Sequence, residues 1–325
     1  MLDSFGRSIN YLRISVTDRC NLRCIYCMPP EGVPQISHSE ILSYEEIRAI
    51  VQAAAELGIN KIRLTGGEPL VRVELPELIR MLSRIEGIEE LSLTTNGVLL
   101  KEYALELKQA GLTRVNVSLD TLKPDKFRYV TRLGKLEAVL GGIEGAREAG
   151  FEPVKINTVV MRGINDDEVL DFARMTSKDG WHIRFIELMP FKDVAEFVPS
   201  IELRKQISLL GKLEPCPDFR GITGNGPAMY YRLAGARGTI GFISPLTETA
   251  FCSRCNRMRL TPDGKLRPCL LGEDEIDLKV PLRNNASIGE LKRLILKAVA
   301  SKPARHHLGE GNIRLVNRKM SQIGG

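Results

Sequence analysis

Short apolar segments alternate with longer segments of helical periodicity over the first 190 residues of the chain. Six segments have the length, the β-branched content and the polar–apolar alternation of strands: 11–17, 61–67, 91–97, 114–120, 153–160 and 182–189. Five segments between them repeat apolar residues every three to four positions, as helices do: 44–57, 74–85, 99–110, 135–149 and 166–177. Ser43 and Glu46 form a capping-box signature before the first helix, and Gly58, Gly111 and Gly150 are helix stop signals.

This regular alternation of strands and helices favours a parallel α/β sheet. Six strand–helix units are two fewer than a complete eight-unit barrel needs. We therefore predict a partial, laterally open (βα)6 TIM-like barrel, with an open doubly wound sheet as the second choice. The rhythm ends near residue 190, and a Gly-rich region with short strand-like runs and one helix near 287–300 follows. The predicted domains are 1–192, the barrel, and 193–325, a smaller α+β domain.

The predicted strands carry basic residues, although strands of a parallel barrel are normally apolar on both faces. These residues are Arg13, Lys61, Arg63, Lys155 and Arg184. In the first two strands the period of two places them on one face together with small polar residues. Buried charge without a partner is unfavourable, so two interpretations stay open. The lumen is either water-filled, with its cations paired to Glu68, Asp120 and Glu187, or it binds a polyanion such as a nucleoside triphosphate.

Cysteines supply the candidate chemistry. Three follow the first predicted strand with the spacing C-x3-C-x2-C, and three have the spacing C-x2-C-x13-C: Cys20, Cys24 and Cys27, then Cys252, Cys255 and Cys269. The start of the chain lacks the apolar core of a signal peptide, so we expect a cytoplasmic protein. Because the cytosol keeps thiols reduced, metal ligation is a better interpretation than disulfides. The seventh cysteine, Cys216, has no partner at ligand spacing and is expected to be a lone thiol.

A β-hairpin is predicted to bring the second cysteine triplet together. The sequence TPDG at 261–264 is typical of a type I turn. Counting outward from Leu260 opposite Lys265 places Cys269 next to Cys255. The residues that share the face of Cys255 are Arg257 and Arg259. A slip of one residue would change this assignment.

Two sites of three thiolates each account for six of the seven cysteines. Soft thiolate donors suit iron–sulfur clusters, in which each iron normally takes one cysteine. A four-iron cluster held by three cysteines leaves one iron open for a small molecule, just as an open position distinguishes catalytic from structural metal sites. Structural zinc stays open as an alternative, mainly for the second triplet.

The first triplet, with Tyr26 between its last two cysteines and GGEP at 66–69 after the second strand, resembles the radical S-adenosylmethionine (SAM) superfamily. Further features narrow the match: the second triplet, SLD at 118–120, GIND at 163–166, RFIE at 184–187 and the terminal Gly324 and Gly325. Together they resemble the MoaA family, the GTP 3′,8-cyclases of molybdenum cofactor biosynthesis. The resemblance runs from Arg7 to the last residue.

This resemblance implies two [4Fe–4S] clusters, one on each triplet, with SAM at the first and GTP at the second. The family's SAM-binding positions correspond to Tyr26, Gly67, Ser118 and Met189. Its GTP-binding positions correspond to Arg13, Arg63, Thr94, Lys155, Arg257 and Arg259, to which Lys61 and Arg184 are added. The family's Gly-Gly tail, which reaches into the site, corresponds to Gly324 and Gly325.

The implied reaction is the radical SAM-dependent cyclisation of GTP to 3′,8-cyclo-7,8-dihydro-GTP, the first step of molybdopterin formation. A SAM-derived radical removes the hydrogen at C3′ of GTP, and the C3′ radical adds to C8 of guanine. The resemblance also implies an electron donor such as flavodoxin or ferredoxin, a possible hand-over of the product to cyclic pyranopterin monophosphate synthase, and a possible homodimer.

Two other functions are weighed against this one. A different radical SAM enzyme with an auxiliary cluster, such as a peptide-modifying one, would usually carry a longer C-terminal cysteine array. A zinc-stabilised nucleic-acid-binding protein fits poorly, because the net charge of +6 is not gathered into a basic tract. No apolar run is long enough for a membrane span, and no G-x4-G-K-[ST] motif indicates GTPase-like binding. His306 and His307 are expected to lie in a solvated loop.

Overall fold

One curved sheet organises the protein in this computed structural model, which describes residues 1–190, 195–216, 226–306 and 318–324. Its strand order is β12-β11-β10-β1-β2-β3-β4-β5-β6-β9-β8-β7. The strands are β1 (Tyr11–Ser15), β2 (Lys61–Thr65), β3 (Glu90–Thr95), β4 (Arg114–Ser118), β5 (Lys155–Val160), β6 (His182–Glu187), β7 (Leu213–Pro215), β8 (Met229–Leu233), β9 (Ile240–Ile243), β10 (Arg257–Leu260), β11 (Lys265–Arg267) and β12 (Ile276–Asp277).

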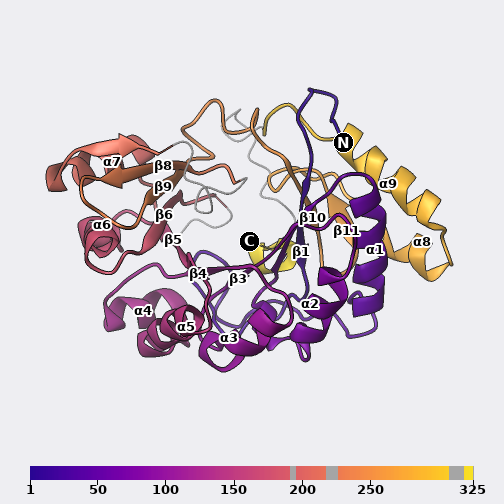
Figure 1. Cartoon of the computed structure of the whole chain (residues 1–325), viewed down its shortest axis with the longest axis horizontal. Helices are drawn as coiled ribbons and strands as arrows, with labels where there is room; N and C mark the ends of the chain where they lie inside the picture. Colours follow the sequence, from indigo (N-terminus) through magenta and orange to yellow (C-terminus); the bar gives the residue numbers. More distant parts are fainter. Residues whose placement is uncertain (191–194, 217–225, 307–317, 325) are drawn as a thin grey trace.

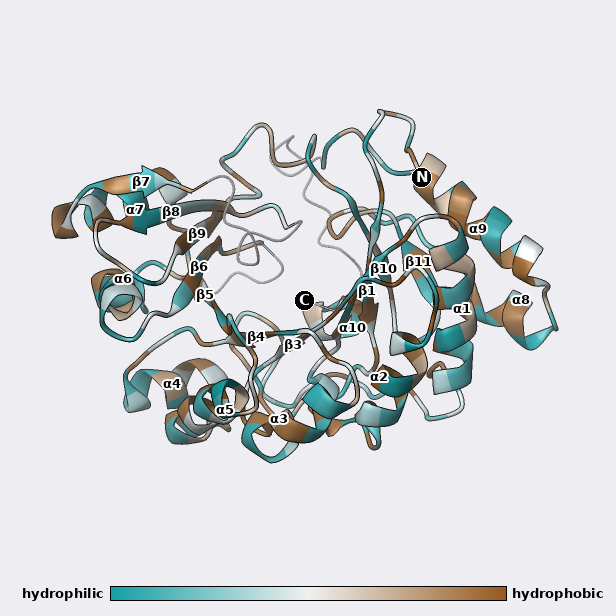
Figure 2. Cartoon of the chain, viewed as in Figure 1, coloured by the Kyte–Doolittle hydropathy of each residue, from teal (hydrophilic) through white to brown (hydrophobic). Residues whose placement is uncertain are grey.

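The helices cover the convex side of this sheet, and α10 lies within its curve (Figures 1 and 2). The α-helices are α1 (Tyr44–Glu56), α2 (Leu75–Ser83), α3 (Leu100–Gln109), α4 (Pro124–Thr131), α5 (Leu136–Glu148), α6 (Val169–Lys178), α7 (Ser200–Ile207), α8 (Lys279–Arg283), α9 (Ile288–Ala300) and α10 (Met320–Ile323). Short 3-10 helices are η1 (Pro69–Val71), η2 (Asp166–Glu168) and η3 (Ser208–Leu210). Within the described residues, no helix is both long and apolar enough to cross a membrane.

Strands β1 to β6 are parallel and follow one another in chain order, with helices between them. The sheet does not close, so the predicted partial, laterally open barrel is confirmed. The capping box is also confirmed: the Ser43 hydroxyl accepts from the Glu46 amide at 3.1 Å, and the Glu46 carboxylate accepts from the Ser43 amide at 2.7 Å. Helix α4 was not predicted.

The strands after residue 193 join both edges of the same sheet. β10 pairs in parallel with β1, and β9 pairs in parallel with β6. β11 and β12 then continue one edge, and β8 and β7 the other, as antiparallel strands. The sheet is therefore continuous across the boundary predicted at 192/193, and the division into two domains stays a prediction. Both parts of the chain contribute side chains to the same concave interior.

The register predicted for the β10–β11 hairpin is wrong by one residue. Leu260 lies opposite Leu266, not opposite Lys265. A β-turn is present at the predicted position, since the Gly264 amide donates to the Thr261 carbonyl at 3.0 Å, but Gly264 itself has a φ of +81°. A turn followed by a left-handed glycine adds one residue to the loop as a bulge. This extra residue shifts every pair beyond it.

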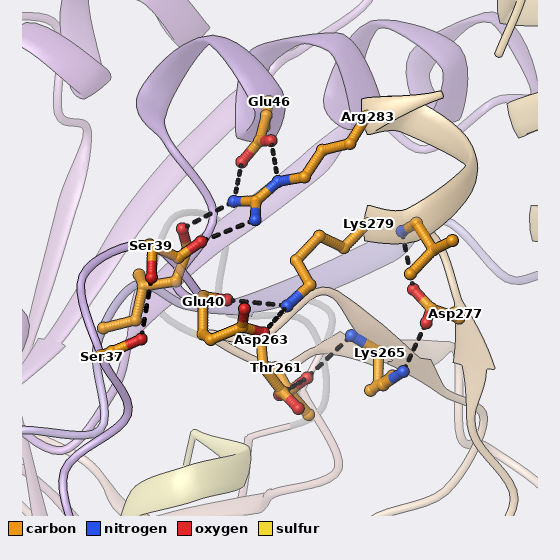
Figure 3. Close-up of polar contacts among 12 residues, drawn as sticks. Ser37, Ser39, Glu40, Glu46, Thr261, Asp263, Lys265, Asp277, Lys279 and Arg283 are labelled. Atoms are coloured by element: carbon orange, nitrogen blue, oxygen red, sulfur yellow. Dashed lines mark hydrogen bonds and ion pairs between the residues drawn. The ribbon is translucent and has the colours of Figure 1, made fainter. Parts of the chain in front are cut away.

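The apolar face of each strand packs against the helices, and the opposite face points into the concave interior. In β1 and β2 the completely buried residues include Ile14, Ile62 and Leu64. Ion pairs then tie the C-terminal helices to the N-terminal part of the chain. Arg283 of α8 pairs with Glu46 of α1 with an Nε–Oε1 distance of 2.7 Å, and Lys279 pairs with Glu40 (Figure 3).

Candidate active site

All six cysteines of the two triplets line one cavity in the concave interior. Every described residue predicted to contact SAM or GTP lines the same cavity: Arg13, Tyr26, Lys61, Arg63, Gly67, Thr94, Ser118, Lys155, Arg184, Met189, Arg257 and Arg259. These residues come from β1 to β6, from β10 and from the loops that follow the strands. The structure thus brings together two cysteine groups that are more than 220 positions apart in the sequence.

Arginines form a row across the strands at one edge of this cavity. Arg13 of β1 lies opposite Arg63 of β2 on one side and opposite Arg259 of β10 on the other. The Thr94 hydroxyl accepts hydrogen bonds from Arg63 Nη1 at 3.2 Å and from Asn116 Nδ2 at 3.4 Å. Neighbouring parallel strands are only about 4.8 Å apart, so the three guanidinium groups repel one another unless an anion lies between them.

Among the described residues, the cavity lining has nine arginine and lysine side chains and three carboxylates. The basic ones are Arg13, Lys61, Arg63, Arg114, Lys155, Arg184, Arg257, Arg259 and Lys302. Of the carboxylates, Glu90 pairs with Arg114 at 3.4 Å. Within the described part of the chain, Glu68 and Asp120 accept hydrogen bonds from amide and hydroxyl groups instead of from lumen cations, and Glu187 does the same. The predicted pairing of the lumen cations with Glu68, Asp120 and Glu187 is therefore wrong.

Burial and mutual repulsion change the ionisation of these cations. The pKa of Lys155 falls to about 6, first because the side chain is buried and then because Arg184, Arg114 and Arg63 are near. Burial and Arg257 lower the pKa of Arg259 to about 10. Nε and Nη2 of Arg184 are buried and have no hydrogen-bond partner among the described residues. Such donors and charges suit a ligand with several negative charges.

The loop that carries the first triplet follows β1 and folds back on itself. The amides of Cys27 and Met28 donate to the Cys24 carbonyl at 3.0 and 3.1 Å. Cys20 Sγ accepts from the Leu22 amide at 3.4 Å. Burial raises the pKa of Cys20 to about 11, and it raises the pKa of Cys24 well above its ordinary value, helped by the neighbouring thiols and Asp120.

Two buried carboxylates support this loop. Asp120 accepts from the Tyr26 hydroxyl at 2.7 Å and from the Val159 amide at 2.8 Å, and burial raises its pKa to about 6. Glu68 accepts from the Asn96 amide at 2.7 Å, and burial raises its pKa to about 7. Asn96 Nδ2 in turn lies 3.9 Å from Cys20 Sγ. Glu68 and Asp120 thus lie near the first triplet, together with the Arg23 guanidinium, whose Nη1 donates to the Cys20 carbonyl at 2.6 Å.

Gly67 is required by a close approach of two backbone segments. Its amide donates to the Thr17 carbonyl at 2.8 Å, and a Cβ atom added at this position would lie 2.3 Å from the Arg19 carbonyl oxygen. No other residue fits such a gap. Because the amide of Gly67 is already bonded, only its carbonyl is available to a ligand.

Cations surround the second triplet. The Cys255 amide donates to the Cys252 carbonyl at 3.0 Å, and Arg257 Nη2 lies 3.7 Å from Cys255 Sγ. Lys302 Nζ donates to the Arg257 and Pro268 carbonyls at 2.8 and 2.5 Å. Burial alone would raise the pKa of Cys255, but Arg257 and Lys302 outweigh it and lower that pKa to about 6.

Sequence reasoning missed the segment after α9, which turns back to the cavity. His306 lines the cavity, and its Nε2 lies 2.7 Å from the Pro245 carbonyl oxygen, so the prediction of a solvated loop is wrong for this residue. His307 lies outside the described residues. Arg7 binds the segment to the second triplet, since its Nη1 donates to the Cys252 and Ala304 carbonyls at 2.9 and 3.0 Å. Arg7 was noted only as the start of the resemblance.

The C-terminal tail enters the same cavity. Met320 and Ser321 line it, and the Gly324 carbonyl accepts a hydrogen bond from Arg259 Nη1. Gly324 has a φ of +70°, and a Cβ atom there would lie 2.7 Å from Thr65 Cγ2. Gly325 lies outside the described residues. Cys216 is not among the residues lining the cavity.

Both triplets fit an iron–sulfur cluster by the chemistry of their donors. Among the described residues, no group of three or more His, Cys, Asp or Glu side chains is arranged to hold a single metal ion. A cluster places its cysteines on different irons, so its thiols need to face a shared space and not a single point. The three thiols of each triplet face the cavity in this way.

Family models match most of the chain. Residues 14–176 match the radical SAM superfamily, and residues 181–308 match the family described as Molybdenum Cofactor Synthesis C. The chain is 54% identical to a GTP 3′,8-cyclase of Moorella thermoacetica over 329 residues, which covers 100% of both proteins. It is also 54% identical to a GTP 3′,8-cyclase of Pelotomaculum thermopropionicum over 330 residues, again with 100% coverage of both.

Solved structures with a similar fold include two proteins with bound S-adenosylmethionine. Streptococcus suis SuiB bound to S-adenosylmethionine superposes with a TM-score of 0.61 at 14% identity, covering 91% of this chain. This chain spans 65% of the SuiB chain, just under two thirds. The enzyme anSMEcpe with bound AdoMet gives a TM-score of 0.56 at 17% identity, covering 90% of this chain and 81% of that one. At such identities the likeness concerns the fold alone.

Proposed function

The chain belongs to the radical SAM superfamily and, within it, to the GTP 3′,8-cyclases, and on this premise we propose how its residues divide the work of converting GTP to 3′,8-cyclo-7,8-dihydro-GTP. The enzyme uses two [4Fe–4S] clusters and SAM, and its substrate is GTP. The observation that carries the proposal is the single cavity, lined by both cysteine triplets and by nine basic side chains.

We assign SAM to the part of the cavity around the first triplet. Cys20, Cys24 and Cys27 hold the first cluster. When bound, this cluster supplies the electron that cleaves SAM and so starts the radical chemistry at C3′ of GTP. The Gly67 carbonyl accepts from the methionine amino group of SAM, because the Gly67 amide is bonded to Thr17. Tyr26, held by Asp120, orients the adenine side, and Ser118 and Met189 complete the SAM contacts.

We assign GTP to the cationic part of the cavity. Cys252, Cys255 and Cys269 hold the second cluster, beside which the guanine lies. The row Arg13, Arg63 and Arg259 faces the triphosphate, because guanidinium groups bind phosphate oxygens in pairs. Further contacts come from Lys61, Thr94, Lys155, Arg184 and Arg257. Neutralising these cations favours binding, and the shared cavity keeps the C3′ hydrogen near the radical source.

The Gly324 and Gly325 tail completes the site in this proposal. Gly324 already lies against β1 and β2, where Ser15 and Thr65 leave space for a glycine only. Its carbonyl is bonded to Arg259, one of the proposed GTP contacts. The tail therefore lies next to the substrate and excludes water from this end of the cavity.

An acidic one-electron carrier such as flavodoxin or ferredoxin is the proposed reductant, oxidised by one electron as the first cluster is reduced. The end of α4 supports a docking surface, since the amides of Arg23 and Ile25 in the cluster loop donate to its carbonyls at 3.0 and 2.9 Å. The exposed side chains at this end of the helix and in the loop that follows it are basic and apolar: Arg128, Tyr129, Leu133 and Lys135. Hand-over to cyclic pyranopterin monophosphate synthase and a homodimer stay predictions.

The test is an anaerobic assay. The protein is reconstituted with iron and sulfide, reduced with dithionite and given SAM and GTP, and 5′-deoxyadenosine and the cyclised nucleotide are measured by mass spectrometry. Both products are expected, and Cys24→Ala is expected to abolish both. If 5′-deoxyadenosine forms without cyclised GTP, the protein is a radical SAM enzyme, but GTP cyclisation is not its reaction. Neither product, with zinc bound in place of iron, would reject the proposal.

A further inference from the structure

The C-terminal segment is fastened to the protein just before it enters the cavity. The Arg318 guanidinium makes two bonds to the Asp263 carboxylate, at 3.1 and 2.9 Å, and two to the Glu275 carboxylate, at 2.6 and 2.9 Å. The three side chains are 19%, 20% and 21% exposed. Ion pairs with this bidentate geometry and shielding are worth more than ordinary surface pairs.

Both carboxylates lie next to the strands that follow or precede the cysteines of the second triplet. Asp263 lies in the turn between β10 and β11, where its carboxylate also accepts from the Thr261 hydroxyl at 2.6 Å. Glu275 precedes β12 and pairs with the buried Arg267 of β11. Arg318 is therefore attached to the outer end of the hairpin whose inner face carries Arg259.

The tail then returns to the inner face of the same hairpin. Between Arg318 and Gly324 lies only the four-residue helix α10 with one residue before it. Ile323 is 1% exposed, and the Gly324 carbonyl accepts from Arg259. The tail thus has an outer attachment at Asp263 and an inner one at Arg259, four positions apart in the sequence. With so short a connection, any displacement of Arg318 displaces Gly324 as well.

We propose that Arg318, Asp263 and Glu275 form a clamp that positions the C-terminal tail against Arg259, next to bound GTP. The inference rests on the proposed function, in which Gly324 and Gly325 act in the site. Among the described residues that line the cavity, none of the three clamp residues is found. They are therefore positioning residues that act through the tail, and they touch neither substrate.

The test compares Arg318→Gln with Arg283→Gln in the reconstituted enzyme. Arg283 is a matched control, because its guanidinium also makes a two-bond pair, with Glu46 at 2.7 and 3.2 Å, but far along the chain from the tail (Figure 3). The first readout is the release of the C-terminal glycines by carboxypeptidase, followed by mass spectrometry. We expect release about tenfold faster in R318Q than in the wild type, and an unchanged rate in R283Q.

The second readout is the reaction itself. We expect R318Q to form cyclised GTP about tenfold more slowly, with little change in the affinity for GTP, because a displaced tail disturbs the bound geometry and not the cationic lumen. R318K, which keeps the charge but not the two-bond geometry, should fall between R318Q and the wild type. Gly324→Ala should lower the cyclisation rate by a smaller factor in R318Q than in the wild type, because the tail of R318Q is already displaced.

Two results would overturn the clamp. One is a C-terminal tail that stays protected from carboxypeptidase in R318Q. The other is a tail that carboxypeptidase reaches in R318Q while GTP is cyclised at the wild-type rate. If R318Q does not fold, Asp263→Asn serves in its place, with the same expected direction. The carboxypeptidase readout needs no turnover. A wild-type enzyme that forms no cyclised GTP would therefore reject the proposed function while the clamp itself could still be judged.

Discussion

The two cysteine triplets hold the same donors in different surroundings. Around the first triplet burial dominates, the carboxylates of Glu68 and Asp120 are near, and the pKa of Cys20 rises to about 11. Around the second, Arg257 and Lys302 overcome the effect of burial, and the pKa of Cys255 falls to about 6. Both triplets face one cavity.

This difference indicates which substrate each triplet receives. SAM carries a sulfonium cation and an amino group, which acidic surroundings favour. GTP is a polyanion, which the cationic surroundings of the second triplet favour. We propose that the protein separates its two substrates within one cavity by the charge around each triplet.

The largest effect is expected when either triplet is broken. Cys24→Ala should lower 5′-deoxyadenosine formation by at least about a thousandfold, because SAM cleavage depends on the first cluster. Cys255→Ala should keep the cleavage of SAM but lose the cyclised nucleotide by a similar factor. Mass spectrometry of both products measures this, with iron content as the control. A C255A enzyme that still cyclises GTP would contradict the claim that the second triplet is needed for the reaction of GTP.

Lys155, one of the proposed GTP contacts, should change its protonation when GTP binds. With a pKa of about 6 its side chain is mostly neutral at pH 7.5 in the empty cavity. A bound polyanion raises this pKa, so GTP binding should take up as much as about one proton, and the affinity should weaken as the pH rises above about 6. Lys155→Met should remove the uptake and weaken GTP binding by about ten- to a hundredfold.

Calorimetry in buffers of different ionisation enthalpy gives the proton count. The difference between the wild type and K155M excludes protons that the phosphates of GTP exchange by themselves. An equal proton count in the two proteins would show that GTP binding does not change the protonation of Lys155, and it would contradict the proposed contact between this side chain and GTP.

The charge of Asp120, near the first triplet, should lower the stability of the fold. An unfolded aspartate ionises near pH 3.8 and the folded Asp120 near 6, so the stability of the fold falls as the pH rises between these values and stays lower at neutral pH. Asp120→Asn removes the charge, and its one amide oxygen can still accept from the Val159 amide, while the Tyr26 hydroxyl would have to accept from the new Nδ2. At pH 7.5 without SAM it should be more stable by roughly 1–3 kcal/mol, yet bind SAM about tenfold more weakly.

Thermal or denaturant unfolding of D120N and the wild type at several pH values checks this sign. The stability difference should disappear below about pH 4, where both states are protonated. A variant that is less stable than the wild type at pH 7.5 would contradict this prediction. It would mean that the charge of Asp120 stabilises the fold.

The smallest effect concerns the route of the electron to the first triplet. Arg128→Glu combined with Lys135→Glu should slow cyclisation driven by reduced flavodoxin by about three- to tenfold, most strongly at low salt. The rate with dithionite should not change, because a small reductant needs no docking surface. Lys212→Glu, at an exposed site outside α4, is the matched control. An equal loss with both reductants would reject this surface as the docking site.

The barrel strands and the site cysteines could be predicted because their signals are local. A strand alternates side chains with a period of two, and the triplet spacings lie within a few residues. The basic residues of β1 and β2 pointed to a charged lumen for the same reason. Helix α4 was missed because it is short, begins with Pro124 and buries little besides Phe127 and Val130.

Other features depend on tertiary contacts and could not be predicted in this way. The register of β10 and β11 follows from the positive φ of Gly264, which the turn sequence does not reveal. The position of His306 depends on Arg7, at the other end of the chain, which holds the segment after α9 on Cys252. The union of both parts of the chain in one sheet likewise follows from long-range strand pairing.

The most direct test of the division between the triplets is electron paramagnetic resonance of two variants, each with one triplet replaced by alanine and the remaining cluster reduced. SAM should change the spectrum of the variant that keeps Cys20, Cys24 and Cys27, and GTP should leave it unchanged. GTP should change the spectrum of the variant that keeps Cys252, Cys255 and Cys269, and SAM should leave it unchanged. The reverse pattern, or both ligands acting on the same cluster, would contradict this division of the two substrates.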